Sequence, residues 1–116
     1  MSDERTTKEA KAPGADNYRL LEGAVRTYLP EEAQAKIAAA YAFAANYHKD
    51  QRRRSGEPYI NHPVEVALIL AHDLHMDEDT ICAALMHDTV EDTSASLDEI
   101  SSRFGKSVAE LVDGVT

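Results

Sequence analysis

The segment PVEVALILA, residues 63–71, says most about the fold that this sequence can adopt. A proline opens it, and proline is favoured at the first position of a helix, where its missing N–H would have no partner in any case. Among the residues that follow, only Glu65 is charged, so a helix built from them has almost no polar face. Such a helix is typical of the middle of a bundle, where other helices cover it. The segment therefore predicts a central helix in a helical protein.

Helical patterns continue on both sides of this segment. Pro30 is followed by Glu31 and Glu32, which suit the first turn of a helix. Ser96-Leu97-Asp98-Glu99 matches a capping box, the signature of another helix start. The predicted helices cover residues 17–29 and 30–48, begin at residues 63 and 77, and cover 96–105 and 107–112. No alternating strand pattern or internal repeat is present, so the predicted fold is an all-α bundle of about six helices, preceded by a disordered tail over residues 1–16.

Composition limits the classes of function. With 116 residues, the chain is one domain, and its 43% hydrophobic residues are typical of a globular protein. Twelve basic residues against 21 acidic ones give a net charge of −9, which argues against nucleic-acid and anionic-membrane binding. No apolar run is long enough to cross a membrane, and the polar start is no signal peptide. The single cysteine, Cys82, excludes an internal disulfide, so we expect a cytoplasmic protein.

The positive charge is concentrated in one predicted loop, residues 49–62. Lys49, Arg52, Arg53 and Arg54 stand close together in a chain that is otherwise acidic. A loop of this kind can bind a small polyanion, while the rest of the surface repels long ones. The alternative is a solvated loop without a ligand.

A second cluster lies near the end of the fourth predicted helix. Ile81, Ala84 and Leu85 form an apolar stripe whose next position is Asp88. A carboxylate turned into a core costs several kcal/mol unless it is paired or binds a metal. His87 is its neighbour and, if the helix continues, Glu91 and Asp92 join them in one polar patch that favours a divalent cation. The alternative is a helix end in which Asp88 pairs with an arginine.

The sequence neighbours of the remaining histidines and of the cysteine indicate where these residues lie. His62 lies at a helix start before a stiff proline, which suits a metal ligand from a second element, although a lone histidine is more often structural. We expect His48, His72 and His75 to lie on the surface. Cys82 has no basic neighbour and is predicted to be a small core residue rather than a nucleophile.

Two longer motifs resemble the RelA/SpoT homologue family. The stretch RRSGEPYINHP, residues 53–63, is similar to the loop before the third helix of that family. The stretch AALMHDTVEDT, residues 83–93, resembles its His-Asp (HD) motif, and the ending LVDGVT, residues 111–116, is also similar. The resemblance covers the chain from about Tyr18 to its end, so residues 17–116 are expected to be the N-terminal portion of an HD phosphohydrolase domain.

The resemblance implies a manganese-dependent hydrolase that removes the 3′-pyrophosphate of ppGpp or pppGpp, as part of a longer polypeptide that also carries a pppGpp synthetase. Ligand chemistry alone would suit iron or zinc equally well. Synthetase-only members of the family have a degenerate motif in place of the His-Asp pair. This chain keeps the intact pair, His87 and Asp88. The matching positions are His62, His87 and Asp88 for the metal, Glu91 and Asp92 for the attacking water, and Arg53, Arg54 and Ser55 for the guanosine nucleotide.

The family's fourth metal ligand, an aspartate in a later helix, has no counterpart in this sequence. We therefore expect the chain to be an incomplete domain that binds metal weakly and hydrolyses slowly or not at all. Three other functions stay open: a small stand-alone hydrolase, a nucleotide-binding module that regulates without catalysis, and a helical interaction domain without a ligand.

Overall fold

The computed structural model describes residues 15–114, with side chains from residue 17, and this part of the chain is helical without any strand. The helices, numbered from α2, are α2 (Ala15–Arg26), α3 (Glu31–Tyr47), α4 (Asn61–His72), α5 (Glu78–Met86), α6 (Thr89–Asp92), α7 (Leu97–Phe104) and α8 (Lys106–Gly114). The all-α prediction is confirmed. Helix α2 begins two residues inside the predicted tail, and the rest of that tail lies outside the described residues.

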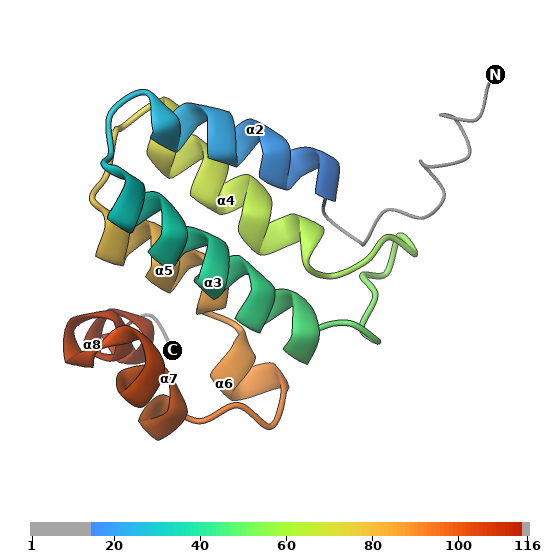
Figure 1. The fold of residues 1–116 in the computed structure, drawn as a ribbon. Helices are drawn as coiled ribbons and strands as arrows, with labels where there is room; N and C mark the ends of the chain where they lie inside the picture. Colours follow the sequence, from blue (N-terminus) through green and yellow to red (C-terminus); the bar gives the residue numbers. More distant parts are fainter. Residues whose placement is uncertain (1–14, 115–116) are drawn as a thin grey trace, which may run out of the picture.

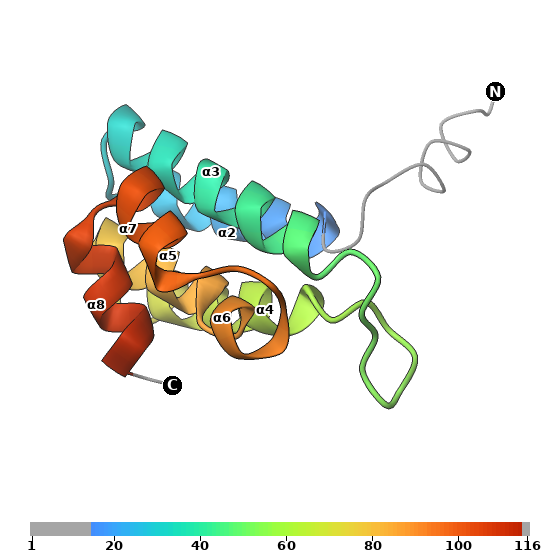
Figure 2. The same cartoon turned by 90° about the horizontal axis from the view of Figure 1, so that it is seen from below.

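Helices α2 to α5 form the body of the molecule, and the pair α7 and α8 packs against it. Helix α2 packs against α3 and α4, and α5 packs against both α3 and α4 (Figure 1). Helices α7 and α8 pack against each other, and α8 also contacts α5. The short helix α6 connects α5 to this pair, as Figure 2 shows from a second direction.

The central helix is α5 and not α4, so the prediction drawn from residues 63–71 is wrong on this point. Every residue from Ile81 to Met86 is buried, and α5 contacts α3, α4 and α8. Its two alanines, Ala83 and Ala84, allow neighbouring helices to approach closely. Helix α4 buries Val64, Ala67 and Ala71, whereas the Ile69 residue is 56% exposed. An apolar composition therefore did not show which helix has neighbours on more sides.

Local signals placed several helix ends correctly. The Ser96 hydroxyl accepts a hydrogen bond from the backbone N–H of Glu99 at 3.1 Å, as the capping box predicts. Gly105 ends α7 with φ of 104°, a conformation that side-chain-bearing residues rarely adopt. Within the described residues, no helix combines the length and apolar character that a membrane crossing needs.

Candidate metal centre

His87 and Asp88 form the junction between α5 and α6. Helix α5 ends at Met86 and α6 begins at Thr89, although both junction residues keep helical φ angles of −62° and −94°. The buried Thr89 hydroxyl donates to the Met86 carbonyl at 2.8 Å and bridges the two helices. The fourth predicted helix is thus divided, and the described residues form seven helices instead of six.

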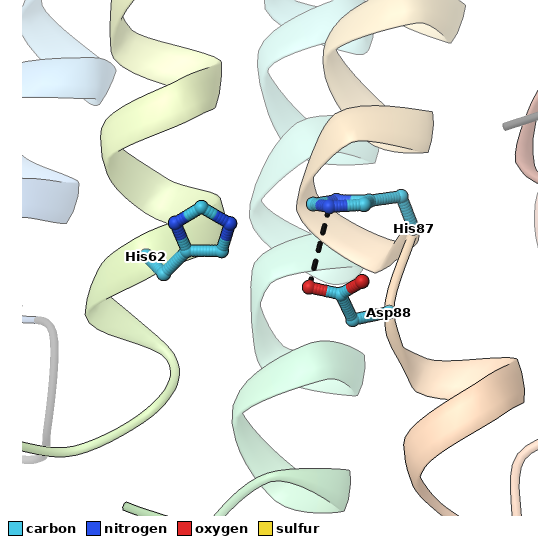
Figure 3. Close-up of side chains that lie close together, drawn as sticks. All are labelled: His62, His87 and Asp88. Atoms are coloured by element: carbon cyan, nitrogen blue, oxygen red, sulfur yellow. Dashed lines mark ion pairs between the residues drawn. The ribbon is translucent and has the colours of Figure 1, made fainter. Parts of the chain in front are cut away.

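The His87 ring is oriented by the last turn of α5. Its Nδ1 atom lies 2.7 Å from the Ala84 carbonyl oxygen, which can only accept a hydrogen bond. Nδ1 therefore carries a proton, and Nε2 is the atom left to bind a ligand. Nε2 lies 3.2 Å from Oδ2 of Asp88 (Figure 3).

The Asp88 carboxylate is partly buried, with its side chain 18% exposed, so it is less enclosed than the apolar stripe of α5 predicted. Tyr59 donates its hydroxyl hydrogen bond to Oδ2 of Asp88 at 2.5 Å. Among the described residues, no arginine forms an ion pair with Asp88, so the predicted alternative of arginine pairing is not what the structure contains. Burial and then the Asp88 hydrogen bond raise the pKa of Tyr59, which keeps its hydroxyl protonated and donating.

His62 completes a cluster of possible ligands. It lies in the first turn of α4, which begins at Asn61 and so two residues before the predicted start. The His62 and His87 ring centroids are 5.9 Å apart, and one ligand atom from each of His62, His87 and Asp88 lies within 4.8 Å of the others (Figure 3). Two imidazoles and a carboxylate suit a divalent transition metal. Because the Nε2 lone pair of His87 faces a carboxylate oxygen, a cation between them would remove an electrostatic repulsion.

The four-member polar patch predicted along one helix does not form. Glu91 and Asp92 lie on α6, are exposed, and are not among the grouped ligand atoms. The expected patch assumed one continuous helix, whereas α5 ends at Met86 and α6 begins at Thr89. Asp92 is still connected to the loop of residues 49–62, because its backbone carbonyl accepts a hydrogen bond from Nε2 of Gln51 at 2.7 Å, and its charge helps to raise the pKa of Tyr59.

The basic loop forms a hairpin that projects from one end of the helical body (Figure 2). The Arg53 N–H donates to the Glu57 carbonyl at 2.9 Å, and the turn closes at Gly56 with φ of 94°. Arg53, Arg54 and Ser55 are all exposed there. They line an open groove of about 510 Å³, and the other residues that line it are Arg52, Glu57 and Tyr59. Tyr59 thus borders the cationic groove and also contacts Asp88.

The sequence analysis gave no role to Tyr59 and placed His48 wrongly. The prediction of a surface position for His48 is wrong, because its side chain is buried. Its ring packs 4.8 Å from that of Tyr59, and its Nδ1 atom lies 2.6 Å from Oε1 of Gln51. A polar neighbour in sequence, Lys49, did not show that Tyr59 and Gln51, at the base of the hairpin, contact the His48 ring. His72 and His75 are exposed and Cys82 is buried, as predicted.

His87 also lines an apolar pocket of about 240 Å³. Its lining comes from three helices and consists of Val66, Leu70, Thr80, Ala83, Ala84, His87 and Leu111.

Comparisons with known proteins identify the family of this chain. The family model of the HD domain matches residues 40–116. The bifunctional (p)ppGpp synthase/hydrolase SpoT of Escherichia coli (strain K12) is 48% identical over 99 residues, which are 85% of this chain and 14% of that protein. The GTP pyrophosphokinase rsh of Brucella melitensis biotype 1 is also 48% identical over 99 residues, 85% of this chain and 13% of its own length.

A solved structure gives the same result at the level of fold. It is described as a metazoan orthologue of SpoT that hydrolyses ppGpp and plays a role in starvation responses. The two structures agree with a TM-score of 0.69 and 40% identity, covering 76% of this chain and 49% of the other. The present chain therefore spans only a small part of the curated relatives it matches. The chain belongs to the HD domain family, in its RelA/SpoT homologue group.

Proposed function

We propose that this chain is a metal-dependent hydrolase domain that converts ppGpp to GDP, and pppGpp to GTP, with release of pyrophosphate. The observation that carries the proposal is that the possible ligands His62, His87 and Asp88 lie beside a cationic groove, with Tyr59 bordering both. The E. coli relative and the metazoan protein of the solved structure are described as acting on this nucleotide. We propose further that the chain is the hydrolase part of a longer polypeptide that also carries a synthetase, as the E. coli relative does.

In the proposed mechanism, Arg53 and Arg54 bind the phosphates of the substrate, and Ser55 donates a further hydrogen bond. Charge-assisted contacts of this kind are about twice as strong as neutral ones. They would hold the nucleotide at the end of the helical body where the ligand cluster lies. Because the arginines are exposed and lie on a hairpin, they can adjust to the ligand without disturbing the core.

His62, His87 and Asp88 would hold the metal, which we propose to be manganese. When bound, a divalent ion of this kind polarises water and phosphate oxygen atoms. Glu91 and Asp92 would orient the attacking water and accept its proton, since carboxylates near a reacting water act as general bases. The water oxygen would form a new bond to the phosphorus attached to the ribose 3′-oxygen while the bond from that phosphorus to the 3′-oxygen breaks. Pyrophosphate would leave with the water oxygen, and the proton would pass to the departing 3′-oxygen.

The net charge of −9 supports a small nucleotide as the partner, with no nucleic acid and no membrane surface. The single cysteine supports a cytoplasmic location.

A second function has one observation in its favour. Glu91 and Asp92 are exposed and lie outside the ligand cluster, and the described residues supply three possible metal ligands. A regulatory module that binds the nucleotide without hydrolysing it would need no more than this. The two functions differ in whether ppGpp is consumed.

The test is to incubate the chain with ppGpp and Mn²⁺ and to separate the products by ion-exchange chromatography. The decisive variant is His87→Ala, Asp88→Ala. A matched control is His72→Ala, Asp73→Ala, since these residues form an exposed His-Asp neighbour pair with 2.8 Å between Nδ1 and Oδ1. Because the chain lacks a counterpart of the family's fourth metal ligand, we expect slow release of GDP and pyrophosphate from wild type and control, and neither product from the decisive variant. Binding of ppGpp without any product would instead support the regulatory module.

A further inference from the structure

The base of the arginine hairpin is attached to both ends of α6. At one end, Tyr59 donates its hydroxyl hydrogen bond to Oδ2 of Asp88 at 2.5 Å. At the other, Nε2 of Gln51 donates to the backbone carbonyl of Asp92 at 2.7 Å. The Tyr59 N–H also donates to the Gln51 carbonyl at 3.0 Å. We call these two residues, Gln51 and Tyr59, the hairpin brace.

The hairpin brace is itself held from behind by a buried residue. The His48 ring packs against the Tyr59 ring, and His48 Nδ1 contacts the Gln51 side chain. The other nitrogen, Nε2, is buried without a hydrogen-bond partner, so packing and Gln51 alone orient the ring. Since His48 follows the last residue of α3, the brace connects that helix to α6.

The Tyr59 hydroxyl has a direct consequence for Asp88. A carboxylate at the end of a helix can rotate about two side-chain bonds, and only some orientations present an oxygen to His62 and His87. A donor at Oδ2 selects one orientation and leaves other lone pairs of the carboxylate free, because two carboxylate oxygens offer about four acceptor sites. Partners of this kind orient metal ligands, and removing one typically lowers metal affinity about 10- to 100-fold.

We infer that the hairpin brace, through Tyr59 in particular, positions Asp88 for metal binding and links the arginine groove to the metal centre. The inference rests on the proposed metal site. Tyr59 acts through Asp88 and is therefore a positioning residue. Because its ring also borders the groove, a ligand that moves the hairpin would change the orientation of the metal ligand.

Tyr59→Phe is the variant that tests this. Phenylalanine keeps the ring between His48 and His62 and removes only the hydroxyl. The matched control is Tyr47→Phe, which removes a tyrosine hydrogen bond of 2.6 Å to the Glu99 carboxylate, between α3 and α7. Mn²⁺ affinity is measured by calorimetry, and the site is probed by the visible spectrum of bound Co²⁺. Circular dichroism melting without metal reports on the fold.

We expect Tyr59→Phe to bind Mn²⁺ about tenfold more weakly or worse and to alter the Co²⁺ spectrum, with little change in the melting temperature. Tyr47→Phe should leave both metal readouts unchanged. Equal affinity of wild type and Tyr59→Phe would overturn the inference and leave the proposed function intact. If the wild-type chain binds neither ion, the proposed metal centre fails, and the inference fails with it.

Should Tyr59→Phe not fold, Gln51→Met gives the second test. It keeps the length of the side chain but removes the contacts to His48 and Asp92. A weaker Mn²⁺ affinity in a folded Gln51→Met chain supports the inference, and an unchanged affinity contradicts it.

Discussion

The Nδ1 atom of His87 is bound to the carbonyl oxygen of Ala84, 2.7 Å away in the last turn of the same helix. This contact presents Nε2 toward Asp88 and His62 before any ligand arrives. The two residues of this contact are only three positions apart along the chain. The contact can serve a metal site only because α4 brings His62 close to His87 and Asp88.

The protonation pattern of His87 can be measured. In slightly alkaline solution, ¹H–¹⁵N correlation spectra of the imidazoles should show the Nδ1–H form for His87. Addition of Zn²⁺ should shift the ring signals of His87 and His62. The exposed His72 and His75 serve as internal controls and should shift little. Signals of His87 that match the Nε2–H form would contradict the orientation described here.

Substitution of the groove arginines should weaken nucleotide binding. Each charge-assisted hydrogen bond contributes about 1.5–3 kcal/mol, so Arg53→Gln with Arg54→Gln should lower ppGpp affinity by tenfold or more, and the salt dependence should fall. The control, Arg19→Gln with Arg26→Gln, removes two exposed charges on α2. Fluorescence titration with a labelled ppGpp measures both. An equal loss in the control would mean that net charge, and not the groove, determines binding.

The ion pair between Lys36 and Asp79 predicts a pH dependence of stability. Lys36 Nζ lies 2.8 Å from Asp79 Oδ1, and this hydrogen bond lowers the pKa of Asp79, with a further contribution from Ser107. A carboxylate with a lowered folded-state pKa stabilises the fold above its unfolded pKa of about 4, and this stabilisation is lost as pH falls through the folded pKa. Lys36→Met should therefore lower the free energy of unfolding by about 1 kcal/mol at neutral pH and by progressively less below pH 4.

The matched control for that experiment is Lys106→Met. Lys106 and Glu110 are 3.9 Å apart and far more exposed, so removing this pair should leave the urea midpoint nearly unchanged at every pH. Equal effects of the two substitutions would show that the α3–α5 ion pair contributes no more than a surface pair.

Replacing glycine by alanine should change the free energy of unfolding in opposite directions at Gly105 and Gly23. Gly105 has φ of 104°, and a Cβ there meets no atom within 4 Å, so backbone strain alone opposes a side chain. Gly105→Ala should destabilise the fold by about 1–3 kcal/mol. Gly23 lies within α2 with equally open space, and Gly23→Ala should stabilise it by up to about 1 kcal/mol. Urea denaturation measures both, and destabilisation at Gly23 would contradict the local argument.

Cys82 should be unreactive in the folded chain. Burial raises the pKa of its thiol to about 12, and the thiolate is the reactive form. Iodoacetamide at pH 8 should label it only after denaturation in urea, which mass spectrometry can follow. Rapid labelling of the native chain would show that α5 opens far more readily than a central helix should.

Local sequence was a good guide to several features. Ser96 caps α7 and Gly105 ends it because a hydroxyl acceptor and a positive φ act within one turn of the chain. The metal cluster could be proposed because His87 and Asp88 are adjacent and the His62 loop resembles a known motif. The candidate roles of Glu91 and Asp92 stay predictions, since both residues lie outside the ligand cluster.

Other features depended on residues far apart along the chain. The hydrogen bond from Tyr59 to Asp88 spans 29 positions, and Gln51 reaches Asp92 across 41. Contacts with Gln51 and Tyr59 accompany the burial of His48. Periodicity and capping are short-range properties, so the sequence by itself determined most of the helices, some of their ends and the His-Asp pair. Which helix became central and which tyrosine donates a hydrogen bond to Asp88 were decided only by the tertiary structure, because burial and side-chain partners depend on how distant segments pack together.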